Sequence, residues 1–372
     1  METVFVGMSG GVDSSVAAML LKQRGYKVVG VFMKNWSQDL PGMPCPWRED
    51  FADAKRVAVQ LGIDFKMYDF EKEYKDKVVD YMLKEFKAGH TPNPDIMCNQ
   101  EIKFGLFFHT AMADGADYIA TGHYAKTKNG KLFMAKDKAK DQTYFLYRAT
   151  ESTLKKTLYP IGDYLKSEVR VMATKHKLVT ADKKESMGLC FVGKVGIKEF
   201  LSQYVKSKAG PIIDQKGNQI GEHDGAIFYT IGQRHGLDIG GGLPYYVTGK
   251  DMKKNEVYVT TDLQDEKLWS RIINFTNAHW INQPPADSHQ SSVISHQSKT
   301  SRLETSDKRL FARTRHRGEL IKVKKLNPST SLRAGKSTQW TVELKDDVRA
   351  VTPGQSIVFY CGNQCLGGGI VS

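Results

Sequence analysis

The 372-residue chain has few of the features that mark secreted, membrane-spanning or metal-rich proteins. Its five cysteines are an odd number, which argues against a disulfide framework and indicates a reducing compartment. No run approaches the roughly 20 apolar residues of a membrane helix. The first residues lack the basic and apolar regions of a signal peptide, so we expect a cytoplasmic protein with no membrane contact. No cysteine or histidine cluster has zinc-ligand spacing, so no metal site is predicted.

Acidic residues are scarce relative to basic ones, since 41 Asp and Glu face 54 Lys and Arg, a net charge of +13. With 40% hydrophobic and 26% charged residues, the composition is typical of a folded globular protein and not of a disordered one. The excess predicts a polyanionic partner without identifying it. It is concentrated between Lys299 and Lys336, where twelve Lys and Arg stand against three acids.

The order of apolar runs predicts three domains, with bounds at residues 1–205, 206–268 and 269–372. In the first, strand-like runs such as Lys27–Met33 alternate with helix-like segments such as Arg48–Leu61. This alternation predicts a doubly wound parallel sheet with right-handed βαβ crossovers. Ligands of such sheets bind beyond the carboxyl ends of the strands.

The later parts of the chain predict β-structure. Short β-like runs such as Ala226–Ile231 indicate a small β-rich middle domain. The strand-and-turn pattern after Trp269 indicates a C-terminal antiparallel β-barrel or sandwich. Two polar, low-complexity segments, 283–306 and 327–338, interrupt this pattern and are expected to be loops.

The string SGGVDSS, Ser9 to Ser15, lies between the first predicted strand and the first predicted helix. Its paired glycines allow close approach of a phosphate, and a helix N-terminus offers free N–H groups. The alternative is a glycine-rich turn with a capping Asp or Ser. It is neither a dinucleotide fingerprint nor a Walker A loop, because the one Gly-Lys-Ser, at 335–337, lacks the upstream glycine. The string therefore predicts a nucleotide site of another kind.

Two cysteines stand in unusual local sequences. In TPNPDIMCN, Thr91 to Asn99, two prolines favour an extended loop, with Asn99 expected to cap the next helix. Asp95 and Cys98 could then face one site, and a thiol at a helix N-terminus tends to be acidified. The alternative is a buried cysteine acting as a small hydrophobe, against which the scarcity of apolar neighbours weighs.

Cys190, in ESMGLCFVG, has more apolar neighbours, and spacing alone favours a buried core cysteine there. Cys361 and Cys365 are expected to be packing or surface residues, and Cys45 is left unassigned. Arg313, Arg315 and Arg317 alternate along a predicted strand, which would set three guanidinium groups about 6–7 Å apart on one face. Such a face would match phosphate spacing, and the alternative is an ordinary solvated face.

The combined motifs resemble a known family. SGGVDSS resembles the PP-loop of ATP pyrophosphatases, whose domain is HUP-like. Together with TPNPDIMCNQEIKFG, ATGHYAK, DQTYFLY, ESMGLCFVG, FYTIGQRHGL and a terminal PGQ…CLGGG, it makes nearly the full chain similar to tRNA-specific 2-thiouridylases. Other ATP-dependent synthetases, and a non-catalytic tRNA-binding protein, are the competing interpretations. The two cysteines and the basic barrel speak against the first, and the intact loop speaks against the second.

The resemblance implies a reaction. ATP, entering as its Mg²⁺ complex, adenylates the C2 oxygen of the wobble uridine of tRNA, and sulfur from a cysteine persulfide replaces that oxygen. A protein persulfide donor is implied as a partner. Cys190 would carry the persulfide, Cys98 would be the nucleophile and Asp95 is the candidate general acid or base. Either the persulfide attacks C2 directly or Cys98 first releases free sulfide, and the sequence does not separate these routes.

Further site residues are implied by position. The expected ATP contacts are Gly7, Met8, Ser9, Gly10, Gly11, Val12, Asp13, Ser14, Met33 and Gly122. The loop that meets the target base would consist of Asn93, Pro94 and Asp95. The expected tRNA contacts are His123, Asp141, Gln142, Thr143, Tyr144 and Gln355, to which the charge pattern adds Arg313, Arg315 and Arg317.

Overall fold

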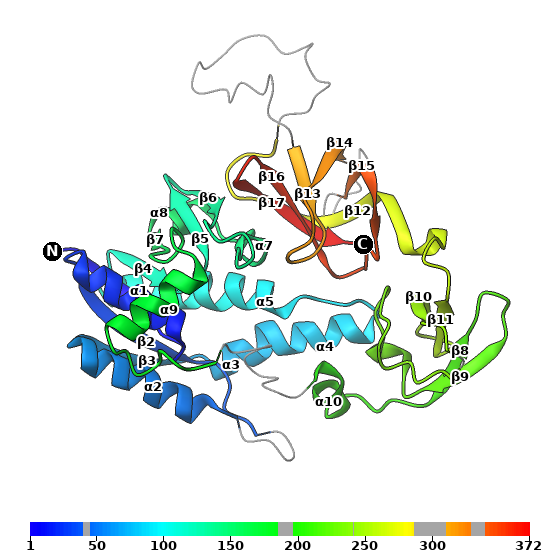
Figure 1. Cartoon of the computed structure of the whole chain (residues 1–372), viewed down its shortest axis with the longest axis horizontal. Helices are drawn as coiled ribbons and strands as arrows, with labels where there is room; N and C mark the ends of the chain where they lie inside the picture. Colours follow the sequence, from blue (N-terminus) through cyan, green and yellow to red (C-terminus); the bar gives the residue numbers. More distant parts are fainter. Residues whose placement is uncertain (40–44, 185–195, 241, 286–309, 329–338) are drawn as a thin grey trace, which may run out of the picture.

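The computed structural model describes residues 1–39, 45–184, 196–240, 242–285, 310–328 and 339–372 (Figure 1). The segment that carries Cys190 and most of the two polar low-complexity segments lie outside the described residues. Among the described residues, no helix is both long and apolar enough to cross a bilayer.

The N-terminal part is built on a parallel sheet, as the alternating pattern predicts. Its strand order is β3-β2-β1-β4-β7, and all four pairings are parallel. The strands are β1 (Thr3–Gly7), β2 (Lys27–Lys34), β3 (Asp64–Asp69), β4 (Tyr118–Thr121) and β7 (Thr157–Leu158). The order reverses at β1, so the loops after β1 and β4 meet at the switch point where such sheets bind ligands.

Helices cover both faces of this sheet because its central strands are apolar on both faces. Val4 and Val6 of β1 pack with α1 (Val12–Gln23) and α2 (Trp47–Leu61) on one face. Phe5, pointing the other way, belongs to a larger cluster with the helices of the opposite face. These helices are α3 (Glu71–Tyr74), the π-helical η1 (Lys75–Val79), α4 (Asp80–Lys87), α5 (Pro94–Met97), the π-helical η2 (Cys98–Phe107) and α6 (Phe108–Ala113).

The rest of the N-terminal part is a β-hairpin and four helices. It consists of the hairpin β5 (Ala125–Lys128) and β6 (Lys131–Met134), followed by α7 (Thr143–Leu146), α8 (Glu151–Lys155), α9 (Lys166–Lys175) and α10 (Ile197–Ser202). Figure 1 shows α4 and the helix labelled α5 running side by side from the parallel sheet towards the middle β-sheet.

The middle part is a four-stranded sheet in the order β10-β11-β8-β9. Its strands are β8 (Gly210–Ile213), β9 (Gln219–His223), β10 (Tyr246–Asp251) and β11 (Glu256–Thr260). The expected β-like run at Ala226–Ile231 is wrong, because Ala226–Phe228 forms the 3₁₀ turn η3. Both Ala226 and Ile227 are buried there, so the apolar run reflects burial and not strand pairing.

The C-terminal part is a closed antiparallel barrel, as expected. Its order is β12-β15-β14-β13-β16-β17, and β17 pairs back to β12 to close the sheet. A short turn, η4 (Glu266–Leu268), precedes it, and its strands are β12 (Trp269–Trp280), β13 (Leu310–Arg313), β14 (Ile321–Pro328), β15 (Trp340–Arg349), β16 (Ser356–Cys361) and β17 (Gln364–Val371). Inward apolar side chains such as Phe275, Val342 and Phe359 fill its interior.

The barrel is joined to the N-terminal part through backbone pairing. Strand β6 continues the barrel sheet by pairing with β17, where Leu132 lies opposite Cys365. Both residues are fully buried. Since a β-hairpin of the N-terminal part extends a sheet of the C-terminal part, these two parts share one sheet and not only a side-chain interface (Figure 1).

Candidate active site

The loop that joins β1 to α1 is shaped to hold an anion. Gly10 has a φ of +72°, and a Cβ there would lie 2.3 Å from the backbone oxygen of Asp50, so only glycine fits. Gly11 is the N-cap of α1. In the described part of the chain, no side chain makes a capping hydrogen bond at this helix N-terminus. The first-turn N–H groups of α1 are therefore oriented for an anionic ligand.

The serine hydroxyls of this loop hold its shape. The Ser14 Oγ accepts from the Ser9 N–H at 3.2 Å and donates to the Gly11 oxygen at 3.1 Å. The Ser15 Oγ donates to the same oxygen at 2.8 Å and accepts from Thr180 Oγ1 at 3.0 Å. The Ser14 and Ser15 hydroxyls therefore donate within the loop. The backbone N–H groups at the start of α1 are available as donors to a phosphate.

The structure brings the other expected ATP-contact residues to the same edge of the sheet. A Cβ on Gly122, after β4, would lie 2.6 Å from the Ser14 backbone nitrogen. A Cβ on Gly7, at the end of β1, would lie 3.0 Å from the Met33 Cε at the end of β2. Met8 is fully buried. Three loops of the sheet therefore converge on the N-terminus of α1, and glycines permit the approach.

Asp13, in the first turn of α1, is held by an ion pair that the sequence did not reveal. Both of its carboxylate oxygens lie 2.8 Å from the Lys166 Nζ of α9. The Tyr124 hydroxyl also donates to Asp13, at 3.0 Å. No spacing rule connects positions 13 and 166, so only the folded chain shows this pair. Lys166 places a cation next to the loop.

The segment before Cys98 begins a helix earlier than expected. Asn93 Oδ1 accepts from the Ile96 N–H at 3.4 Å, which makes Asn93 the N-cap of α5, and Pro94 is the first helical residue. The helix continues into η2. The expected cap at Asn99 is wrong, since its Nδ2 donates to the Phe145 oxygen at 3.1 Å. Cys98 lies in the second turn, where the effect of the helix N-terminus on a thiol has faded.

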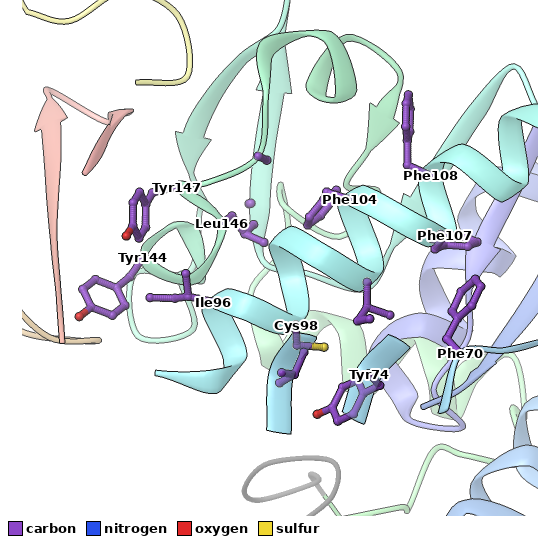
Figure 2. Packing of buried hydrophobic residues seen from close by; sticks show 14 of the residues in the cluster. Phe70, Tyr74, Ile96, Cys98, Phe104, Phe107, Phe108, Tyr144, Leu146 and Tyr147 are labelled. Atoms are coloured by element: carbon purple, nitrogen blue, oxygen red, sulfur yellow. The ribbon is translucent and has the colours of Figure 1, made fainter. Parts of the chain in front are cut away.

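Cys98 is also more buried than its local sequence indicates. It is 5% exposed and belongs to the largest apolar cluster, with Tyr74, Ile102 and Phe104 (Figure 2). The expectation of few apolar neighbours is wrong because Cys98 lies in a helix and not in a loop, so that Ile102 and Phe104 of η2 and Tyr74 of α3 share its cluster. The thiol is therefore shielded from water by the packing of two helices.

Lys103, which the sequence analysis passed over, links the two halves of the site. In a π-helix, residues five apart lie one turn apart, so Lys103 follows Cys98 by one turn of η2. Its Nζ lies 3.4 Å from the His123 Nε2, next to Gly122. Burial raises the pKa of the Asp95 carboxyl, and the charge of Lys103 opposes that rise. One cation thus lies between the residues of the ATP loop and those near Cys98.

His123, expected from the resemblance to contact tRNA, is 8% exposed. Its Nδ1 lies 2.8 Å from Thr121 Oγ1 and its Nε2 faces Lys103. Burial and the charge of Lys103 lower its pKa well below the ordinary value, so the ring is neutral at pH 7. His123 therefore fits a position between the two halves of the site.

The segment Asp141–Tyr144 connects domains in this structure. Asp141 is 1% exposed and Thr143 and Tyr144 are fully buried. The Asp141 Oδ1 accepts from the Ala135 N–H at 3.1 Å, and the Tyr144 hydroxyl donates to the Ser356 oxygen at 2.9 Å. Gln142 is half-buried, and its Oε1 accepts from the Tyr124 N–H at 2.9 Å. A contact between this segment and tRNA stays a prediction.

The three arginines do not alternate along one strand as predicted. Strand β13 ends at Arg313, and Arg315 and Arg317 lie in the turn that follows, with Arg317 at a φ of +58°. Arg313 points inward, with its Nη1 3.3 Å from Asp141 Oδ2 and its guanidinium over the Tyr360 ring. Arg315 and Arg317 are exposed. Only these two of the three are placed to meet a polyanion.

Three further cysteines lie in the described part of the chain. Cys365 is fully buried in the barrel sheet, and Cys45 and Cys361 are half-buried. Cys190 lies outside the described residues, so its relation to Cys98 rests on the sequence alone.

Fold and site together define a protein with a nucleotide-binding HUP domain followed by two β-domains. Three family models match in that order: a tRNA methyl transferase HUP domain over residues 2–194, a tRNA methyl transferase PRC-barrel domain over 198–261 and an aminomethyltransferase β-barrel domain over 270–371.

Curated relatives match the chain over almost its whole length. A protein of Bacillus subtilis named tRNA-specific 2-thiouridylase MnmA is 46% identical over 99% of this chain and 94% of its own. One of the same name from Enterococcus faecalis is 44% identical over the same shares. The chain belongs to this family of tRNA-specific 2-thiouridylases. A 4-thiouridine synthetase structure with RNA and ATP aligns at a TM-score of 0.36 and 18% identity, over 55% of this chain and 50% of that one.

Proposed function

We propose that this chain uses ATP to replace the C2 oxygen of the wobble uridine of tRNA with sulfur, releasing AMP and pyrophosphate. The observation that carries the proposal is the continuity of the site. Lys103 joins His123, beside the anion-binding loop, to the helix of Asp95 and Cys98. The names of the relatives supply the substrate class.

The ATP loop fits a triphosphate on structural grounds. The N-terminus of α1 presents backbone N–H groups, and Gly10, in close contact with the Asp50 backbone, gives the loop before α1 a conformation that only glycine can adopt. We expect Mg²⁺ to enter with the nucleotide, because metal ions in such sites are held largely by substrate phosphates. Chelation of Mg²⁺ should therefore stop pyrophosphate release while tRNA still binds.

The C2 carbonyl of uridine is a poor electrophile, and its oxygen is a poor leaving group. Adenylation converts this oxygen into a phosphate ester that can depart as AMP. Sulfur of a persulfide on Cys190 then bonds to C2 as the C2–O bond breaks. Attack of the Cys98 thiolate on the Cys190 sulfur frees the thiocarbonyl and leaves a Cys98–Cys190 disulfide, which an external thiol must reduce.

In the alternative route, Cys98 attacks the persulfide first, and the released sulfide attacks C2. Asp95 suits a proton-transfer role in either route, because burial holds its pKa above the usual carboxyl range. The target base must leave the anticodon stack to reach these groups. We expect the activity in the cytoplasm, and a persulfide-carrying protein as the sulfur donor.

The test is pyrophosphate release and nucleoside mass spectrometry with purified protein, ATP, a persulfide source and tRNA. Release should require tRNA with uridine at the wobble position, and the product should be 2-thiouridine. Cys98→Ser and Cys190→Ser should abolish thiolation and leave tRNA binding near normal. Cys361→Ser is the matched control. Retained thiolation in Cys190→Ser, or a methylated uridine as the product, would contradict the proposal.

A further inference from the structure

Thr91 lies where the three parts of the molecule meet. Its N–H donates to the Pro353 oxygen at 2.8 Å, and its oxygen accepts from the Gln355 Nε2 at 2.7 Å, both in the C-terminal barrel. Its Oγ1 lies 3.1 Å from the Thr230 Oγ1 of the middle part. Every polar atom of Thr91 therefore has a partner outside the N-terminal part.

The barrel side of this junction is a fixed turn. Gly354 has a φ of +90°, and a Cβ there would lie 2.9 Å from both the Thr91 nitrogen and the His90 Cβ. The Gly354 N–H donates to the Val371 oxygen at 2.9 Å, and the Gln355 N–H donates to the Thr352 oxygen at 3.1 Å. The turn is thus held by the barrel itself, and glycine allows it to touch the segment before Cys98.

The middle part approaches the same segment from another direction. Gly89 has a φ of +88°, and a Cβ there would lie 2.8 Å from the Met252 Cγ. The Thr230 N–H is itself held by Gln233 Oε1 at 3.0 Å. His90 is anchored to α4 by a 2.8 Å contact between its Nδ1 and Glu85 Oε2. The chain before Thr91 is therefore as restrained as Thr91 is.

The chain from Thr91 to the reacting residues is short and stiff. Only Pro92 separates Thr91 from Asn93, which caps α5, and Pro94 starts the helix. The two proline rings fix two of the backbone torsions on this path. Fixing Thr91 therefore fixes the start of the helix that carries Asp95 and Cys98.

We propose that Thr91 is a positioning residue through which the barrel and the middle part hold the Asp95–Cys98 helix where the target base must meet it. Gln355 then acts on the reaction through the Thr91 carbonyl. The inference rests on the proposed thiolation. It differs from the tRNA contact that the resemblance implies for Gln355.

The test compares Gln355→Leu and Thr230→Val, alone and together, with Thr261→Val, an exposed control. Loss of one hydrogen bond should lower kcat for thiolation by about 3–10-fold, with KM for tRNA and its salt dependence unchanged. Gln355→Asn, one methylene shorter, should act like Gln355→Leu and guards against a folding defect. A raised KM for tRNA at unchanged kcat would show that Gln355 is a tRNA ligand and overturn the proposal.

A second measurement does not depend on thiolation. Hydrogen exchange of the amides from 94 to 100, without ATP or tRNA, should be faster in Gln355→Leu and Thr230→Val than in the wild type and Thr261→Val. Unchanged exchange would overturn the positioning role. If exchange differs between the variants and the wild type as expected, but the wild type does not thiolate tRNA, the proposed function is overturned and the positioning role is not.

Discussion

At the scale of single residues, Asp95 is under two opposed influences. Burial raises the pKa of its carboxyl, and the positive charge of Lys103 lowers it. A general acid or base works best with a pKa near the working pH, and a carboxyl reaches that range only in a desolvated site. The balance between burial and Lys103 therefore sets the pH at which Asp95 exchanges its proton.

Lys103→Met should raise the pKa of Asp95 further, because it removes the one charge that opposes burial. The limb of the kcat–pH profile that depends on Asp95 should then move to higher pH, whereas Lys103→Arg should leave it in place. Asp95→Asn should remove that limb and lower kcat about 10²-fold or more. A limb that stays in place in Lys103→Met would contradict the link between the two residues.

His316 predicts a pH dependence of stability. Its ring lies 4.4 Å from that of Phe145, and burial, with the charges of Arg317 and Arg313, lowers its pKa from the usual 6.5 to about 4. Between pH 6.5 and about 4, His316 is largely protonated in the unfolded chain and largely neutral in the folded chain. Stability is therefore fully present above about pH 6.5 and falls as the pH falls towards 4.

His316→Phe should reduce the loss of unfolding free energy between pH 7 and pH 5, measured with urea. Because the ring is only half-buried, solvent screening limits the effect to about 1 kcal/mol. The wild type, which shares every other histidine, is the reference. Equal losses in the two proteins would contradict the assignment.

At the scale of elements, the two adjacent glycines of the β1–α1 loop differ in backbone conformation and in the space around them. Gly10 has a positive φ and faces the Asp50 backbone, whereas a Cβ on Gly11 would meet only the Ser9 Oγ, at 3.5 Å. Gly11 also has an ordinary extended conformation, with a φ of −98°. Gly10→Ala should therefore distort the loop, and Gly11→Ala should be tolerated.

We expect Gly10→Ala to abolish ATP-dependent pyrophosphate release and to lower the unfolding free energy by about 1–3 kcal/mol, from strain at the backbone. Gly11→Ala should lose no more than about 1 kcal/mol of unfolding free energy, so a loss of its pyrophosphate release would come from contact of the new Cβ with the nucleotide and not from a distorted loop. Equal effects of the two substitutions on the unfolding free energy would contradict the geometry of the loop.

The elements also show where prediction from the sequence succeeds. The apolar run Lys27–Met33 located β2 to within one residue, because that strand is buried by its own side chains. The prediction failed at α5. The two prolines were interpreted as a loop, whereas Asn93 is the N-cap of the helix and Pro94 is its first residue. The prediction also failed for β13, since a turn and not a strand follows Arg313.

Contacts between distant segments were beyond sequence reasoning altogether. The pairing of β6 with β17, the ion pair of Asp13 with Lys166 and the hydrogen bonds of Thr91 have no local signature. The first and the third depend on where the domains meet, and the ion pair depends on the packing of α9 against α1 within the N-terminal part. The burial of Cys98 likewise depends on another segment of the N-terminal part, because its neighbours come partly from α3.

At the scale of the whole molecule, the charge of +13 is not all available to a polyanion. Arg313 neutralises Asp141 where the barrel meets the N-terminal part, with side chains 11% and 1% exposed. Arg315 and Arg317 lie two and four residues further on and are exposed. Neighbouring arginines in this basic segment therefore differ: Arg313 joins two parts of the molecule, and we expect the exposed Arg315 and Arg317 to attract the polyanion.

This difference is measurable. Arg313→Ala leaves Asp141 buried without its ion-pair partner and should lower the unfolding free energy by about 3–5 kcal/mol. Its salt dependence of tRNA binding should match the wild type under conditions where it is folded. The double variant Arg315→Ala with Arg317→Ala should keep its stability. Its slope of log binding constant against log salt should be reduced by up to about 2, roughly one for each lost phosphate contact. Arg315→Lys with Arg317→Lys, which keeps both charges, should restore the slope. A shallower slope in Arg313→Ala, or an unchanged slope in the double Ala variant, would mean that the polyanion docks on another face of the barrel.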